Sequence, residues 1–171
     1  MKILYLEGGH GVGTSTHADA LAASLRALGH DAVAYHHPRH PDGATGLARV
    51  RWYIDARREL HRRTSPAVIV CDRGPWSGLV YARAVGCSVA EAAMDCALWG
   101  GVPLYLDAPD DVIDARLLLR GEDPASAWPE RTEWRRLAAA EGWQTIDAAA
   151  PVAEVTRALL RLAVAALGGS R

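Results

Sequence analysis

A glycine-rich segment near the start of the chain has the composition of a phosphate-binding loop. It lies between an apolar run at residues 3–6 and an amphipathic stretch at residues 15–28. Glycines allow backbone amides to converge on an anion, and the amino end of a helix adds positive potential. We therefore expect the phosphates of a nucleotide to bind at Gly8, His10, Gly11, Gly13, Thr14, Ser15 and Thr16.

The segment fits the pattern GxxxxGK[ST] with one departure. Gly8, Gly13 and Ser15 stand at positions of the motif, but Thr14 replaces its lysine. The ammonium group of that lysine ordinarily binds the β- and γ-phosphates and neutralises their charge during transfer. The only lysine in the sequence, Lys2, precedes Gly8 by six strand residues, roughly 20 Å at ~3.3 Å per residue. Either an arginine supplies the missing charge, or phosphoryl transfer is weak.

Two other interpretations of this segment stay open. A dinucleotide-binding GxGxxG would need glycine at position 14 or 16, where the chain has threonine, and an acid at the end of the second strand. A plain structural turn would not need glycine at four of the positions between 8 and 13.

A second charged motif, Asp72-Arg73, follows the apolar run at residues 67–71. An acid at the end of a buried strand can bind magnesium, and a neighbouring arginine can hold a phosphate through two hydrogen bonds. Ser15 and Asp72 are therefore the expected magnesium ligands. The alternative is a helix N-cap beside an ordinary ion pair.

These motifs lie within an alternation of expected strands and helices. The apolar runs that predict strands are at residues 3–6, 32–35, 67–71, 102–106 and 143–146. The amphipathic stretches that predict helices are at residues 15–28, 46–63, 75–85, 90–99, 110–119, 129–141 and 152–167, with polar loops at 36–45 and 120–127. The alternation predicts one α/β domain over residues 1–171, with three layers and a five-stranded parallel sheet between helices, as in P-loop NTPases.

Composition excludes several classes of protein. The chain has 171 residues, a formal net charge of −1 and a pI of about 6.6, which is unlike a basic nucleic-acid scaffold or a polybasic membrane anchor. No apolar run approaches the ~18 residues of a membrane span, and we find no export signal. Cys71, Cys87 and Cys96 lack metal-binding spacing. We therefore expect a cytoplasmic protein with reduced thiols and no nucleic-acid or membrane partner.

Three segments together resemble the thymidylate kinase family of P-loop nucleoside-monophosphate kinases. The glycine segment is similar to the family's EGxxGxGKST loop. Arg39-His40-Pro41 and Thr45 are similar to its R-[FE]-P…T segment, and residues 72–81 to its DR[YF]xxSxxA[YF] segment. The resemblance implies ATP and Mg²⁺ as cofactors and transfer of the γ-phosphate to a (deoxy)nucleoside monophosphate, dTMP-like or modified. It also implies a homodimer and a short lid at about residues 120–128.

The resemblance further implies roles for individual side chains. Asp72, Arg73, Arg116 and Arg120 would be catalytic, with Arg116 and Arg120 facing the transferring phosphoryl group. The acceptor would be bound by Arg39, His40, Trp52, Ser77 and Tyr81. Two alternatives remain for Arg49 and Arg57: one of them reaches the acceptor phosphate, or both face solvent. Trp128 and Trp134 are expected to pack against other side chains of the protein.

Departures from the family's pattern leave two alternative functions open. Thr14, His10, Gly74 and Val80 differ from the residues usual at their positions. One alternative is a catalytically impaired homologue that binds a nucleotide and regulates a partner, and the other is a nucleoside kinase. Three roles stay open for the cluster of histidines at positions 36, 37 and 40: contact with the acceptor, exposure to solvent, or binding of a metal.

Overall fold

The computed structural model describes residues 2–37, 41, 43–62, 67–99 and 102–168. The strands in this part of the chain are β1 (Lys2–Gly8), β2 (Ala32–His36), β3 (Val68–Asp72), β4 (Val102–Asp107) and β5 (Thr145–Asp147). The helices are α1 (Thr14–Ala27), α2 (Gly46–Arg62), α3 (Pro75–Ala84), α4 (Ala90–Trp99), α5 (Asp110–Leu118), α6 (Pro124–Glu141) and α7 (Val152–Gly168).

The five strands form one sheet in the order β2-β3-β1-β4-β5, and every neighbouring pair is parallel. This confirms the predicted α/β fold. In the register of β1 with β3, Leu6 lies beside Asp72. Since parallel strands end at the same edge of a sheet, this pairing brings the glycine segment next to the Asp72-Arg73 motif.

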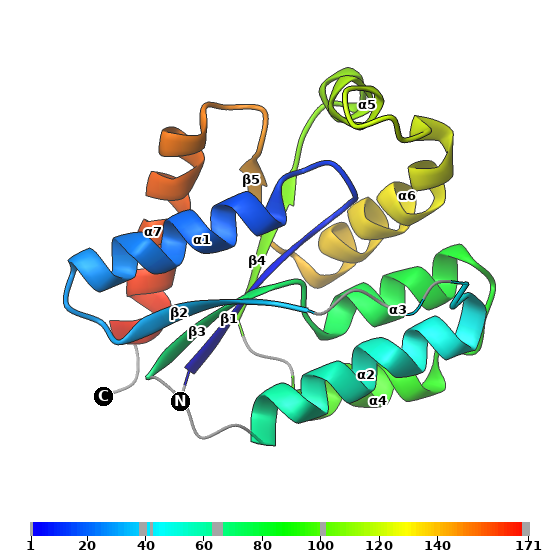
Figure 1. The fold of residues 1–171 in the computed structure, drawn as a ribbon, viewed down its shortest axis with the longest axis horizontal. Helices are drawn as coiled ribbons and strands as arrows, with labels where there is room; N and C mark the ends of the chain where they lie inside the picture. The colour runs from blue at the N-terminus through cyan, green and yellow to red at the C-terminus, as the bar shows by residue number, and fades with distance from the viewer. Residues whose placement is uncertain (1, 38–40, 42, 63–66, 100–101, 169–171) are drawn as a thin grey trace.

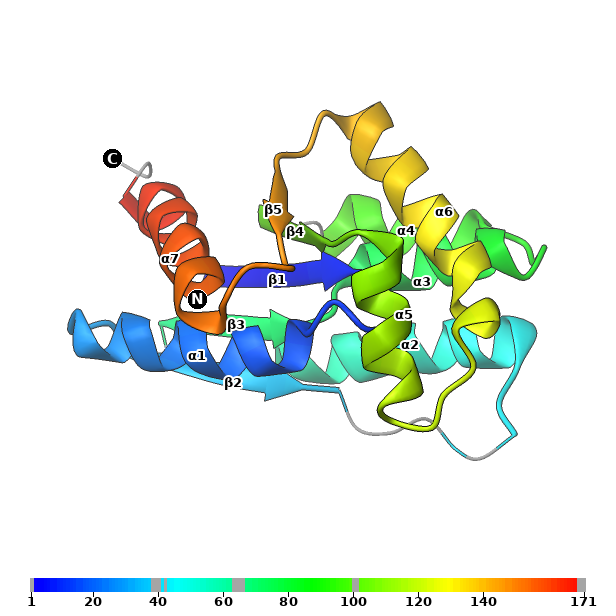
Figure 2. The same cartoon turned by 90° about the horizontal axis from the view of Figure 1, so that it is seen from above.

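Helices cover both faces of the sheet (Figure 1). Helices α1 and α7 pack on one face, and α2, α3, α4 and α6 lie on the other. Side chains alternate along β1, so Leu4 and Leu6 enter the core beneath α1 and α7, while Tyr5 packs with Leu60 on the opposite face. Helix α5 lies beyond the carboxyl end of β1 (Figure 2), where it faces the glycine segment.

The start of α6 corrects one predicted boundary. The sequence predicts a polar loop at residues 120–127 and a helix from Pro129, but α6 already begins at Pro124. The Asp123 side chain caps the helix by accepting from the Ala125 amide at 3.0 Å. Pro124 and Pro129 are each compatible with the first turn of a helix. Because Asp123 caps the helix, α6 begins at Pro124. Much of the segment expected to form the lid is therefore helical.

The end of α6 also displaces the last strand. Gly142 has a φ of 64°, and the Trp143 amide donates to the Ala138 carbonyl at 2.9 Å. These bonds close the helix in a C-terminal cap, so Trp143 is not free to join the sheet. Strand β5 therefore covers Thr145–Asp147 rather than residues 143–146.

A buried ion pair joins α2 to α4. Arg57 has no exposed surface, and its Nε donates to Asp95 Oδ2 at 2.7 Å. Arg57 therefore does not face solvent, and it is not among the residues that line the cavity beside the glycine segment. Of the two tryptophans expected to pack, Trp134 is buried against Tyr105, but Trp128 on the first turns of α6 is 56% exposed.

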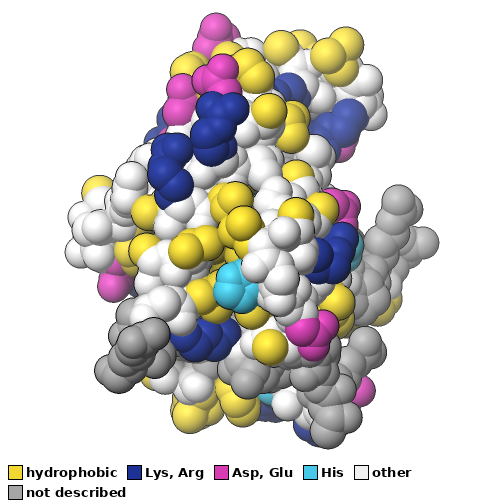
Figure 3. Space-filling model, turned by 90° about the vertical axis from the view of Figure 1, so that its left-hand side faces the viewer, with side chains coloured by type: hydrophobic (Ala, Val, Ile, Leu, Met, Phe, Trp, Pro, Cys, Tyr) yellow, Lys and Arg dark blue, Asp and Glu magenta, His cyan; other side chains and the backbone are white. Residues whose placement is uncertain are grey.

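Part of the surface carries hydrophobic side chains among charged ones. On the side drawn in Figure 3, hydrophobic side chains lie close to Lys and Arg side chains. Within the described residues, no helix is both long enough and apolar enough to cross a membrane.

Candidate functional site

The glycine segment forms the turn from β1 into α1 that the sequence predicts. Gly11 and Gly13 have φ angles of 93° and 90°, which L-residues rarely adopt. A Cβ at Gly11 would lie 2.8 Å from Ile113 Cγ2, so only glycine allows the loop to approach α5 this closely. Gly13, Thr14 and Ser15 line a cavity at the amino end of α1. The unpaired amides and dipole of this helix end favour an anion there.

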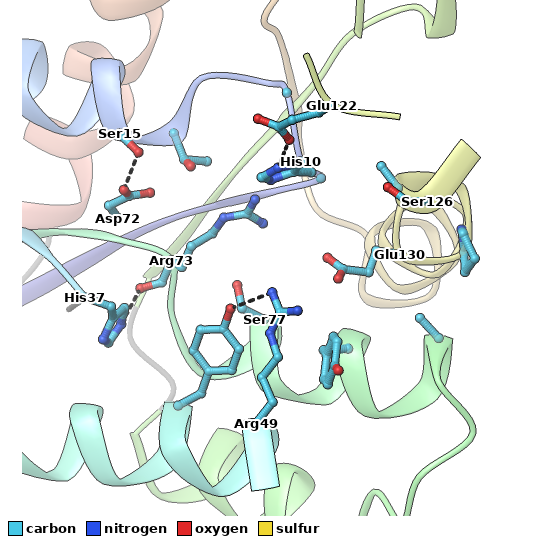
Figure 4. A pocket seen from close by; sticks show the side chains of 18 of the residues that line it. His10, Ser15, His37, Arg49, Asp72, Arg73, Ser77, Glu122, Ser126 and Glu130 are labelled. Atoms are coloured by element: carbon cyan, nitrogen blue, oxygen red, sulfur yellow. Dashed lines mark hydrogen bonds and ion pairs between the residues drawn. The ribbon is translucent and has the colours of Figure 1, made fainter. Parts of the chain in front are cut away.

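Asp72 lies at the end of β3, beside the first turn of α1 (Figure 4). The Ser15 hydroxyl donates to Asp72 Oδ2 at 2.5 Å, and His36 Nδ1 lies 3.1 Å from the same oxygen. Burial favours the neutral carboxyl, but hydrogen bonds from Ser15 and Thr14 and the charge of Arg73 outweigh it and lower the pKa of Asp72. The side chain is therefore a carboxylate at neutral pH.

This carboxylate fits a magnesium ion. Mg²⁺ prefers oxygen ligands and is usually bound by one or two carboxylates together with substrate phosphates. Asp72 Oδ1 is buried and has no hydrogen-bond partner in the described part of the chain. Ser15 and Asp72 thus offer oxygen atoms at the place where the phosphates would bind.

His36, at the end of β2, and the following His37 contact different partners. His36 contacts Asp19 and Asp72, whereas His37 Nε2 donates to the Arg73 carbonyl at 3.3 Å. Among the described residues, no group of three His, Cys, Asp or Glu side chains is arranged to hold a metal. His40 lies outside the described residues.

Arg73 is held in a strained backbone conformation. Its φ is 75°, and among the described residues no other non-glycine residue has a positive φ. The Arg73 amide donates to the Leu6 carbonyl at 3.0 Å. A Cβ at the next residue, Gly74, would lie 2.5 Å from Glu7 Oε1, so this turn packs directly on β1. These contacts fix the backbone from which the Arg73 guanidinium reaches the cavity (Figure 4).

The cavity has a volume of about 750 Å³ and extends from the glycine segment to α2 and α3. The α5–α6 connection and the first turns of α6 line it as well. The volume is within the range of ligand sites, and polar groups converge on it from several elements. One end therefore suits phosphates, and the cavity leaves room for a second molecule beyond Arg73.

Aromatic side chains and an arginine form the wall at the α2–α3 end. The Arg49 guanidinium carbon lies 4.5 Å from the centre of the Tyr81 ring, and Arg49 Nη2 donates to the Tyr53 hydroxyl at 3.4 Å. The Tyr81 hydroxyl accepts from the Gly46 amide at 3.2 Å, which orients the ring. Together with Trp52, these groups offer flat apolar surfaces and a positive charge, as a phosphorylated ring compound requires.

Two curated proteins resemble this chain along its sequence. A thymidylate kinase of Caulobacter vibrioides is 31% identical over an alignment 198 positions long, which covers 95% of this chain and 95% of that protein. A thymidylate kinase of Rhizorhabdus wittichii is 39% identical over an alignment 101 positions long, which covers 47% of this chain and 49% of that protein. No family model matches the chain.

The chain belongs to the thymidylate kinase family. The match to the Caulobacter protein decides this, because it extends over nearly the whole of both sequences. Membership agrees with the five-stranded parallel sheet and with the resemblance predicted from the three motifs. The two names support nucleoside-monophosphate kinase chemistry as the broad class.

The fold gathers most of the residues that the family resemblance singles out. The cavity is lined by the predicted residues His10, Gly11, Gly13, Thr14, Ser15, Trp52, Asp72, Arg73, Ser77, Tyr81 and Arg120. Gly8 ends β1 and Thr16 lies in the first turn of α1, and neither residue lines the cavity. Arg39 and His40 lie outside the described residues.

Arg116 has a different place from the one the resemblance implies. It does not line the cavity, and its guanidinium donates to the Ala148 carbonyl at 2.9 Å. This contact directs it to the segment after β5 rather than to the place of the transferring phosphoryl group. Arg120 does line the cavity, and its Nε donates to the Arg116 carbonyl at 3.3 Å.

Four acidic residues at or behind the cavity are not among the site residues predicted from the sequence. Glu122, Asp123 and Glu130 line the cavity, and Glu7 is fully buried behind Ser77. The Ser77 hydroxyl donates to Glu7 Oε2 at 2.8 Å, which holds the first turn of α3 against the end of β1. Glu7 and Glu122 meet Ser77 and His10 across a large separation in sequence, so no local spacing indicates these two contacts.

Glu7 is expected to make stability depend on pH. Burial raises its pKa to about 7, although the hydrogen bond from Ser77 and the charges of Arg73 and Arg57 oppose this. Between pH 4.5 and 7 the folded protein keeps a proton that the unfolded chain has released, so Glu7 lowers the unfolding free energy as pH rises. Burial lowers the pKa of His37 to about 4, which gives the opposite slope in an overlapping window.

The contribution of Glu7 is therefore measured as a difference between two proteins. Relative to the wild type, Glu7→Gln is expected to gain up to about 3 kcal/mol in unfolding free energy as pH rises from about 4.5 to 7. Urea unfolding at several pH values tests this, with the exposed Glu141→Gln as a control. A difference that stays constant with pH would contradict the prediction.

Proposed function

We propose that this protein transfers the γ-phosphate of ATP to a nucleoside monophosphate, dTMP or a related or modified nucleotide. The observation that carries the proposal is the continuous cavity, which joins the glycine segment to the wall formed by Arg49, Trp52 and Tyr81. Arg73 lies between these two ends, where both a donor and an acceptor phosphate are within reach. Family membership supports the same chemistry.

The proposed reaction is an in-line displacement at phosphorus. An oxygen of the acceptor phosphate forms a bond to the γ-phosphorus, the bond to the β,γ-bridging oxygen breaks, and ADP leaves with that bond's electrons. Little covalent chemistry falls to the protein, so catalysis rests on positioning and charge. Amides of the glycine segment would bind the donor, and Arg73 would neutralise charge on the transferring group.

Magnesium has a defined place in this proposal. Ser15 and Asp72 would hold the ion together with the phosphates of ATP, and the ion would supply positive charge against the β- and γ-oxygens. Asp72 suits this role because its pKa is lowered and one of its oxygens lacks a hydrogen-bond partner among the described residues.

A phosphoryl-transfer assay tests the proposal. ATP and GTP are offered as donors with magnesium, against a panel of nucleosides and nucleoside monophosphates that includes base-modified ones. We expect turnover with a monophosphate. Turnover with a nucleoside alone would indicate a nucleoside kinase. Nucleotide binding without any turnover would favour the regulatory homologue that Thr14 suggests.

A further inference from the structure

The structure raises the question of which group replaces the lysine of the phosphate loop. Thr14 stands at that position. The single lysine of the sequence is at the opposite end of β1, where Lys2 Nζ donates to the Leu167 carbonyl at 2.5 Å. A triphosphate bound at the loop therefore needs another cation to balance its charge.

Several arginines near the loop are already engaged. Arg131 packs beneath Gly9, but its guanidinium pairs with Asp110 and Asp114 at 3.0 and 2.8 Å. Arg135 pairs with Asp107 and Asp110, and Arg116 binds the Ala148 carbonyl. None of these three guanidinium groups lines the cavity.

Apart from Arg73, which lies between the two ends of the cavity, two basic side chains at its phosphate end share one carboxylate. His10 Nε2 contacts Glu122 Oε2 directly, and Arg120 Nε lies 3.7 Å from Glu122 Oε1. All three side chains line the cavity (Figure 4 shows His10 and Glu122). The His10 side chain is 52% exposed and that of Glu122 36%, so water screens the contact and an anion can reach it.

We propose that Arg120 and the protonated form of His10 supply, together with Arg73, the charge of the missing lysine, and that Glu122 is the counter-ion which the donor phosphates displace. The inference rests on the proposed function, because it assigns the groups that bind the donor. A triphosphate carries more negative charge than one carboxylate, so it competes well for both cations. Arg120 and Glu122 belong to the α5–α6 connection, so replacement of Glu122 by the donor phosphates would link this connection to the glycine segment.

The first test removes the negative charge of the counter-ion. Binding of Mg-ATP, AMP and inorganic tripolyphosphate is measured by calorimetry for the wild type, Glu122→Gln and the control Glu133→Gln. Glu133 is also paired with an arginine, Arg136, but does not line the cavity. We expect Glu122→Gln to bind Mg-ATP and tripolyphosphate roughly two- to fivefold more tightly. In this variant the phosphates no longer have to break the exposed contacts of Glu122 with His10 and Arg120. AMP binding should change little.

The second test removes the cation. His10→Asn is expected to weaken Mg-ATP binding by about tenfold or more, as loss of a charged hydrogen bond to a phosphate does. In the double variant, Glu122→Gln should no longer tighten binding as it does alone, because the two side chains act on each other.

Each failure points to a different conclusion. Unchanged or weaker Mg-ATP binding by Glu122→Gln would overturn the role of Glu122, even where the enzyme is active. Equal binding by His10→Asn and the wild type would overturn the role of His10. If Glu122→Gln changes tripolyphosphate binding but the protein does not bind ATP, the proposed phosphate site stands and the proposed kinase function is refuted. Binding of neither ligand would overturn both proposals.

Discussion

Replacing Arg73 by methionine is expected to lower kcat/KM for phosphoryl transfer by about 10²–10³-fold, the usual loss when one preorganised group that stabilises a transition state is removed. Methionine keeps much of the apolar stem but removes the guanidinium. Arg73 takes part in no ion pair found among the described residues, so its charge is available to phosphates.

The backbone at Arg73 explains why lysine should not rescue this loss. The left-handed conformation and the contacts of the Arg73 amide and carbonyl fix where the side chain begins. A guanidinium can bind two phosphate oxygens at once, whereas an ammonium is a single flexible point charge. We therefore expect Arg73→Lys to recover only a small part of the activity.

Steady-state kinetics with the best acceptor of the panel measure both variants. Arg136→Met is the matched control, since Arg136 lies on α6, pairs with Glu133 and does not line the cavity. Full activity in Arg73→Met, with an unchanged melting temperature, would remove Arg73 from the catalytic residues.

Replacing Asp95 by alanine is expected to cost about 3–5 kcal/mol of unfolding free energy, as removal of one partner from a buried ion pair does. The Arg57 and Asp95 side chains are 1% and 2% exposed, and Arg57 Nη2 lies 2.6 Å from Asp95 Oδ2. Without Asp95, the guanidinium remains buried with no carboxylate beside it. The loss also loosens α2, which carries Arg49, Trp52 and Tyr53 to the cavity.

Urea unfolding of three variants tests whether loss of the buried ion pair is the cause of the lower stability. Glu91→Ala is the control on the same helix, because it breaks only the exposed pair with Arg51 and should change stability little. The double variant Arg57→Met with Asp95→Leu should recover most of the lost stability, since apolar residues of similar size replace buried ion pairs well. A loss in Asp95→Ala no larger than in Glu91→Ala would contradict the prediction.

Local patterns were sufficient to predict the architecture. Apolar runs and helical spacing depend on neighbouring residues alone, so the five strands and the parallel sheet follow from them. The boundaries are less certain where two signals compete, as Pro124 and Pro129 do at the start of α6. There the Asp123 cap, rather than the later proline, determines where the helix begins.

The sequence by itself determined which residue types meet at the carboxyl edge of the sheet. The glycine segment and the Asp72-Arg73 motif each follow a strand, and parallel strands must end at the same edge. Their meeting, and the contact of Ser15 with Asp72, therefore follows from topology once the order of the strands is known.

Only the tertiary structure decided how charges pair within and around this site. His10 meets Glu122, Glu7 meets Ser77, and Arg57 meets Asp95, each across a large separation in sequence. Such contacts depend on how helices pack and on which rotamers the packing allows, and a local pattern records neither. For the same reason, Arg120 lines the cavity while Arg116, one helical turn away, binds the Ala148 carbonyl.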